Sequence, residues 1–276
     1  MRAVTLRAST LFLAGALAFG LAACQTQLAS VPVSIDPSTG SEANIESLSA
    51  VIAREPNNPE AYNVRGSAFG RAGRYDEAMA DFNKAIELNP NFARAYYNRA
   101  LIFRRNGDQQ RALADFNASI RADPRYASAY VGRGNMYRQN GQIDLALADY
   151  NSALALDRTD PQAFHNRGLV YQTQGNHQAA IEDFTSAIGL SPRSSEPYNG
   201  RGLSYLALAD ARTALDDFNE AVKLDRQSYI AWTNQGLALE ALGERQKANA
   251  AFARAANLNQ NYQPARDGMR RTTGAG

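Results

Sequence analysis

The sequence has a single cysteine, Cys24, and only two histidines among its 276 residues. One cysteine excludes an intramolecular disulfide. His165 and His177 are twelve positions apart, without the closely spaced His or Cys ligands that a zinc site needs. We expect both histidines to be surface side chains, and we expect the protein to use no metal and no cofactor.

Catalytic motifs are also missing. The sequence has no glycine-rich phosphate loop, no Gly-x-Ser-x-Gly nucleophile elbow, and no Ser, His and Asp set outside the repeat positions described below. We therefore expect a protein that is not an enzyme and has no small-molecule substrate.

The N-terminal segment from Thr10 to Ala23 contains no charged side chain, and Arg2 and Arg7 precede it. It is too short to span a bilayer comfortably and has the layout of a secretory signal. Its end, Leu-Ala-Ala-Cys24, resembles the lipobox of bacterial lipoproteins. That resemblance implies a signal peptide over residues 1–23, palmitate or a similar acyl chain on Cys24, and a tether over residues 24–40. The alternative is an ordinary signal peptide with an incidental cysteine.

The charges balance once this signal is removed. Cleavage before Cys24 takes away Arg2 and Arg7 and no acidic residue, so 29 − 2 = 27 basic side chains face 27 acidic ones. A net charge of zero argues against nucleic acid as a partner.

Internal repetition dominates the rest of the chain, because six segments of 34 residues align without a gap. The units are residues 59–92, 93–126, 127–160, 161–194, 195–228 and 229–262. Each has an aromatic residue at position 4, a small residue at 8 and a large one at 11, which lie on one helical face. A glycine at position 15 divides five units into two halves. Each unit is therefore predicted to be a helix, a turn and a second helix.

These positions, with alanine at 20 and Phe or Tyr at 24, resemble the tetratricopeptide repeat. The resemblance implies an all-α fold, a right-handed α-solenoid of six helical hairpins. A solenoid needs a cap at each end. We expect residues 41–56 to form an N-terminal capping helix and residues 263–276 a short closing helix, through Arg271, followed by a flexible tail.

Position 7 departs from the family pattern, because it is arginine in five units where leucine is usual. Position 23 is aspartate in the same five units. Both series stop in the sixth unit, so we predict an ion-pair ladder within the repeats, structural in role: Arg65 and Asp81, Arg99 and Asp115, Arg133 and Asp149, Arg167 and Asp183, and Arg201 and Asp217.

A partner-binding groove is implied by the family at positions 2, 5, 9 and 12 of the first helices. We expect it to be basic early and apolar late, with these candidate residues: Arg94, Tyr97, Arg104, Asn135, Arg138, His165, Leu169, Leu203 and Leu206, and Arg105 beside them. Such a surface suits protein or peptide segments that are acidic and apolar. The alternative is that the arginines are solvated and the leucines only cover the joints between helices.

Together these features predict a membrane-anchored periplasmic scaffold that binds other envelope proteins, similar in layout to the NlpI-type lipoproteins. The lipid anchor would hold it to a membrane, and Gln25 after the cysteine favours the periplasmic face of the outer membrane. The alternative is an assembly factor similar to the pilotin lipoproteins, which carry secretin subunits to the outer membrane.

Overall fold

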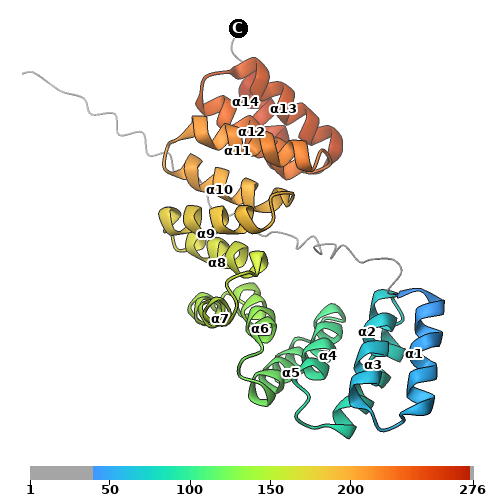
Figure 1. Ribbon diagram of the computed structural model, residues 1–276. Coiled ribbons are helices and arrows are strands. Elements are labelled where there is room, and N and C mark those ends of the chain that lie inside the picture. Colours follow the sequence, from blue (N-terminus) through green and yellow to red (C-terminus); the bar gives the residue numbers. More distant parts are fainter. Residues whose placement is uncertain (1–39, 274–276) are drawn as a thin grey trace, which may run out of the picture. The chain divides into compact units, whose positions relative to one another are not determined.

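The computed structural model describes residues 40–273 of the chain (Figure 1). These residues form fourteen helices and no strand. The helices are α1 (Glu42–Arg54), α2 (Pro59–Arg71), α3 (Tyr75–Leu88), α4 (Ala93–Arg105), α5 (Gln109–Ala122), α6 (Ala127–Gln139), α7 (Ile143–Leu156), α8 (Pro161–Thr173), α9 (His177–Leu190), α10 (Ser195–Ala207), α11 (Ala211–Leu224), α12 (Tyr229–Ala241), α13 (Arg245–Leu258) and α14 (Gln263–Thr273).

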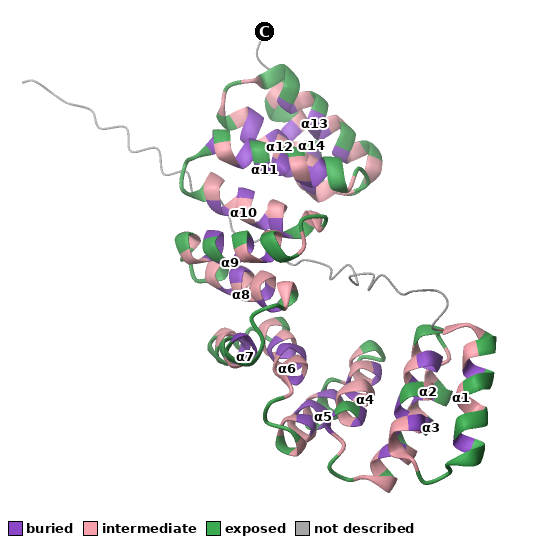
Figure 2. Cartoon of the chain, in the orientation of Figure 1, coloured by how far each residue is buried: buried purple, intermediate pink, exposed green. Residues whose placement is uncertain are grey.

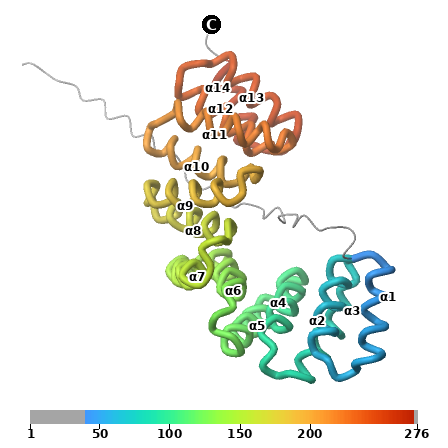
Figure 3. Tube along the Cα trace, in the orientation of Figure 1, coloured from blue at the N-terminus to red at the C-terminus, as the bar shows by residue number. Residues whose placement is uncertain are grey.

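The helices from α2 to α13 form six antiparallel hairpins, one per repeat, and each hairpin packs against the next (Figure 3). The predicted fold class is confirmed: the described chain is an α-solenoid of six hairpins with an additional helix at each end. Signal peptide, Cys24 and nearly all of the predicted tether lie outside the described residues.

The turn inside every hairpin has the same hydrogen bonds. In the first unit Gly73 N donates to Gly70 O at 3.2 Å and Arg74 N donates to Phe69 O at 2.9 Å. This is the Schellman motif, which needs a left-handed residue after the helix. Glycine supplies it in five units, whereas the fifth unit uses Ala209 with φ of 62°.

The core consists of the small and aromatic residues that the repeat predicts. Alanine at position 20 and the ring at position 24 are buried in all six units, the rings being Phe82, Phe116, Tyr150, Phe184, Phe218 and Phe252. A Cβ added to Gly202 would lie 2.7 Å from the Phe218 ring. Glycine at position 8 therefore lets the two helices of a hairpin approach closely. Figure 2 shows buried positions distributed along the whole stack.

Both ends of the stack are covered by a helix. Ser41 caps the N-terminus of α1, which buries Ile45 and Ile52. At the other end α14 packs against α13 and α12, and Gly268 lies against the ring of Phe252. The helix includes Thr272 and Thr273, so the expectation that a tail begins at Thr272 is wrong. The hydroxyl groups of both threonines accept hydrogen bonds from Asn249 Nδ2 at 2.9 Å, which holds this last turn on α13.

Within residues 40–273, no helix has the length and apolar character needed to cross a membrane.

Candidate functional site

Five arginine and aspartate pairs run along the stack, each inside one repeat. Arg65 donates from Nε and Nη2 to the two carboxylate oxygens of Asp81 at 2.8 and 2.7 Å. The equivalent pairs are Arg99 with Asp115, Arg133 with Asp149, Arg167 with Asp183, and Arg201 with Asp217. The arginine side chains are 20 to 21% exposed and the aspartates 6 to 8%. The ladder is thus partly buried.

The remaining arginine nitrogen connects each repeat to the one before it. Arg99, Arg133 and Arg167 donate from Nη1 to Asn83, Asn117 and Asn151 at 2.7 to 2.8 Å. Arg201 uses Thr185 in the same way, and Arg65 uses Ser49 of the capping helix. The pairing with aspartate raises the pKa of each of these five arginines.

The predicted partner-binding residues lie on the first helices, and the basic ones come from the second and third repeats. Tyr97 of α4 lies with its ring centroid 5.3 Å from that of Tyr126 and 5.9 Å from that of Phe116. Burial raises the pKa of Tyr97 to about 12. These two aromatic neighbours hold the Tyr97 ring in place at the side of the site.

Tyr150 of α7 brings a hydroxyl group to the same region. It occupies position 24, where the other five units have phenylalanine. Its side chain is fully buried, and its hydroxyl donates to Asn135 Oδ1 at 2.7 Å. Burial raises the pKa of Tyr150 to about 12, and the positive charges of Arg138 and Arg104 oppose that shift. Both arginines thus lie close enough to act on this hydroxyl.

Two polar atoms in this region are buried without a hydrogen-bond partner in the described chain: Arg138 Nε and His165 Nδ1. The His165 ring lies 5.6 Å from that of Phe184. Burial, followed by the charge of Arg138, lowers the pKa of His165 to about 4. Native proteins seldom leave such groups unsatisfied, so both atoms are available to a water molecule or to a polar group of a ligand.

Both histidines, expected at the surface, are only partly exposed. Nδ1 of His165 and Nδ1 of His177 are each buried without a partner among the described residues. Sequence alone favours exposure, because imidazole is polar, but position 5 of α8 packs the His165 ring against the core aromatic of its own hairpin.

Tyr97, Arg104, Arg138, Tyr150 and His165 thus form one group, which we call the basic cluster. It draws on α4, α6, α7 and α8. Arg104 and Arg138 have no ion pair in the described part of the chain, and the charge of Arg104 acts on both tyrosines. Two positive charges without an ion pair, beside the partly exposed ring of Tyr97, suit an anionic group on a partner.

Two predicted arginines have other contacts. Arg94 forms an ion pair with Glu60 of the preceding repeat, so its charge is already balanced. The guanidinium of Arg105 lies over the ring of Tyr75, 4.4 Å from its centroid, and the side chain is exposed. This contact directs Arg105 to the preceding hairpin. Arg105 is therefore not part of the basic cluster.

The structure supports the apolar half of the predicted groove less clearly than the basic half. Leu203 and Leu206 are partly buried and pack against the core formed by α11, α12 and α13. Leu169 is also only partly exposed. Leu203 and Leu206 therefore cover a joint between hairpins, as the alternative interpretation of the sequence has it.

Sequence reasoning missed Tyr150 and treated it as a core ring. The signal was present, because a tyrosine at a position that is otherwise phenylalanine carries a hydroxyl that needs a partner when buried.

No group of three or more His, Cys, Asp or Glu side chains that could hold a metal is found among residues 40–273.

Models of the tetratricopeptide repeat match most of the stack. One, described as a TPR repeat, matches residues 66–107 and 134–175, and three others match residues 93–126, 159–229 and 199–264. No curated protein matches the chain.

Several solved structures share the fold. A chain of the APC/C hetero-tetramer Cut9–Hcn1 is 20% identical with a TM-score of 0.73; the match covers 86% of this chain and 47% of that one. The chain thus spans about half the length of that relative. PilF of Pseudomonas aeruginosa is 17% identical with a TM-score of 0.71, covering 79% and 99%. YrrB, titled a TPR protein with an unusual peptide-binding site, is 20% identical with a TM-score of 0.54, covering 68% and 96%.

Proposed function

Because the chain belongs to the tetratricopeptide repeat family, we propose that it is a scaffold that binds an acidic segment of another protein at the basic cluster. The observation that carries this proposal is the pair of buried polar atoms without a partner, Arg138 Nε and His165 Nδ1. Proteins of this family bind peptides or other proteins, and we propose no catalytic activity for this one.

The chemistry of the partner follows from these atoms. Leaving a buried donor unsatisfied costs about 1–3 kcal/mol, and more when the donor is charged. A carboxylate placed at the cluster would accept from Arg138 and offset that cost. Hydrogen bonds between a guanidinium and a carboxylate are also short and strong. The partly exposed ring of Tyr97 would limit access of water to the contact.

We further propose that the protein is tethered to a membrane of the bacterial envelope through an acylated Cys24. The support is in the sequence: an uncharged segment after Arg2 and Arg7, and the lipobox-like residues before the only cysteine. Stable anchoring needs more than one acyl chain or a second membrane signal. The periplasmic face of the outer membrane is the location we favour.

Charge reversal tests the binding surface. Proteins cross-linked to the membrane-bound chain would be compared between wild type and the double variant Arg104→Glu and Arg138→Glu. The matched control is Arg121→Glu with Arg193→Glu, two exposed arginines without an ion pair in the described chain. We expect the first variant to lose its partners and the control to keep them. Retention of every partner by the first variant would refute the basic cluster as the binding site.

The anchor has its own test. The variant Cys24→Ser should lose incorporation of labelled palmitate and should move from the membrane fraction to the soluble periplasmic fraction. Continued membrane association without lipid incorporation would show that another element holds the protein there.

A pilotin-like role is the second function to test, suggested by the combination of a lipobox and six repeats. If the protein carried secretin subunits, a deletion strain would fail to form secretin multimers in the outer membrane. Normal multimers in that strain would exclude this role and leave the scaffold proposal in place.

A further inference from the structure

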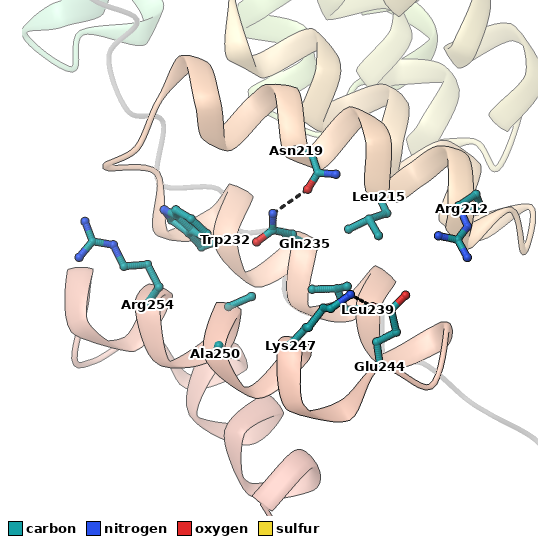
Figure 4. Close-up of a pocket in the computed structure, with 11 residues that line it drawn as sticks. Arg212, Leu215, Asn219, Trp232, Gln235, Leu239, Glu244, Lys247, Ala250 and Arg254 are labelled. Carbon is teal, nitrogen blue, oxygen red and sulfur yellow. Dashed lines mark hydrogen bonds and ion pairs between the residues drawn. The ribbon is translucent and has the colours of Figure 1, made fainter.

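A cavity of about 600 Å³ lies at the joint between the fifth and sixth repeats (Figure 4). It lies between α11, α12 and α13. The residues that line it are Arg212, Leu215, Asn219, Trp232, Gln235, Leu239, Glu244, Lys247, Ala250, Ala251 and Arg254. A smaller cavity of about 350 Å³ lies at the related joint between α7 and α8, where Arg167 is one of the lining side chains.

The larger cavity coincides with the place where the ion-pair ladder is interrupted. Gln235 occupies position 7 and Ala251 occupies position 23, which are arginine and aspartate in the other five repeats. Gln235 Nε2 donates to Asn219 Oδ1 at 2.8 Å, so the link to the preceding repeat is preserved. The pair inside the repeat has no replacement, because alanine ends at Cβ.

The floor of the cavity is apolar. Leu215, Leu239 and Ala251 are 9%, 7% and 4% exposed. Leu239 stands at position 11, where the other units have an aromatic ring. Trp232 forms one side, and its Nε1 donates to Arg226 O at 3.1 Å, which fixes the indole. A bulky apolar side chain of a partner would contact the two leucines and the indole.

The rim is basic. Arg212, Lys247 and Arg254 face one acidic side chain, Glu244, which gives a net charge of +2. Lys247 is paired with Glu244 at 2.6 Å. Arg212 and Arg254 have neither an ion pair nor a side-chain hydrogen bond in residues 40–273, and Figure 4 shows them at opposite ends of the cavity. Carboxylates on either side of an apolar residue would complement that arrangement.

We propose that this cavity binds a protein segment in which one bulky apolar side chain is flanked by acidic residues. The apolar side chain enters the space between Trp232, Leu215 and Leu239, and the flanking carboxylates pair with Arg212 and Arg254. The site is lined by α11, α12 and α13 and includes Gln235 and Ala251, the ladder positions of the sixth repeat. It is therefore separate from the basic cluster, whose residues belong to α4, α6, α7 and α8.

The sequence supplies a specific reporter, because Trp232 is the only tryptophan in the chain. The probe is a synthetic peptide, Asp-Glu-Phe-Asp-Glu with blocked ends, added to the full chain while tryptophan fluorescence is recorded. We expect a saturable change in intensity or wavelength. A peptide with serine in place of phenylalanine should bind at least tenfold more weakly, because it lacks the apolar group.

The decisive variant restores the ladder. Gln235→Arg together with Ala251→Asp introduces the pair that the other five repeats contain, and it fills the cavity with groups that already fit this fold. We expect circular dichroism and melting temperature to stay at or above those of the wild type, while the affinity for the peptide falls at least tenfold. If this variant failed to fold, Arg212→Glu with Arg254→Glu at the exposed rim would serve instead, with the same expected loss.

Two controls separate this site from the basic cluster and from general charge effects. Arg104→Glu with Arg138→Glu should leave the Trp232 titration unchanged, as should Arg121→Glu with Arg193→Glu.

Three results would overturn the proposal. One is the absence of a saturable fluorescence response when the peptide is added to the wild type. Another is a folded variant, either Gln235→Arg with Ala251→Asp or Arg212→Glu with Arg254→Glu, that binds the peptide as tightly as the wild type does. The third is self-association of the wild type that the ladder-restored variant abolishes, because the occupant would then be a second copy of the chain.

Discussion

Arg133 donates to both carboxylate oxygens of Asp149, at 2.9 Å from Nε and 2.7 Å from Nη2, although sixteen positions separate the two residues. Its guanidinium carbon also lies 5.7 Å from the ring centroids of Tyr130 and Tyr137. The pair therefore joins the two helices of one hairpin between two aromatic side chains. Each aspartate is nearly buried, so its charge depends on the arginine for compensation.

Breaking one pair should cost more than removing it whole. Asp149→Ala leaves the Arg133 guanidinium without its carboxylate, and we expect the free energy of unfolding to fall by about 2–4 kcal/mol, a little below the cost for a fully buried pair. Arg133→Gln with Asp149→Ala copies the natural residues of the sixth repeat and should cost less. Urea denaturation of both variants measures this. A double variant no more stable than the single one would contradict the argument.

Ala209 is a local weakness in the fifth repeat. Its φ of 62° is in the left-handed region, where a side chain costs about 1–2 kcal/mol. Ala209→Gly should therefore stabilise the protein by about 1 kcal/mol. The reverse change at the equivalent position, Gly175→Ala, should destabilise it by a similar amount, since nothing within 4 Å of an added Cβ would complicate the comparison. Thermal unfolding of the two variants should shift in opposite directions.

Two helical glycines should respond in opposite ways to alanine. A Cβ on Gly132 would lie 2.4 Å from the buried Phe116 ring, so Gly132→Ala should destabilise the protein by about 1–3 kcal/mol through overpacking. Gly189 has nothing within 4 Å of such a Cβ. Gly189→Ala should stabilise α9 by about 0.5–1 kcal/mol, because alanine favours the helix. Equal effects in denaturation would show that packing at Gly132 is unimportant.

Stability should decrease in mild acid because of His165. Burial lowers its pKa from 6.5 to about 4, so between these values the unfolded chain binds a proton that the folded chain does not. The stabilisation is present above pH 6.5 and is lost as the pH falls towards 4, up to roughly 3 kcal/mol. His165→Gln, which cannot titrate, should show a smaller loss over that range. Identical pH profiles would mean that the imidazole is solvated in the native state.

Much of the fold follows from local sequence signals. The 34-residue period, the alternation of small and aromatic residues, and the glycine at position 15 predict hairpins because each signal acts within one repeat. The ladder could be predicted for the same reason: Arg65 and Asp81 lie in one hairpin, and both series stop together in the sixth unit.

The candidate site could be predicted only in part. Arg104 and Arg138 were identified by their repeat positions, but the burial of His165 Nδ1 was not, since it depends on how α8 packs against the ring of Phe184. Arg105 follows Arg104 directly, at position 13 and not at the groove position 12, and its guanidinium contacts Tyr75 of the preceding hairpin. Helical periodicity assigns a residue to a face, and packing between hairpins determines what that face meets.

The sequence by itself determined the hairpin repeat, its turns and the arginine and aspartate ladder, because spacings within 34 residues set all three. Tertiary structure alone decided that four helices bring two arginines without ion pairs, two tyrosines and a histidine with a buried Nδ1 into one cluster. It also decided that the absence of one pair, at Gln235 and Ala251, leaves a cavity with a basic rim. Both features depend on contacts between successive hairpins, and their geometry is set by the combined packing of side chains that are far apart in the sequence.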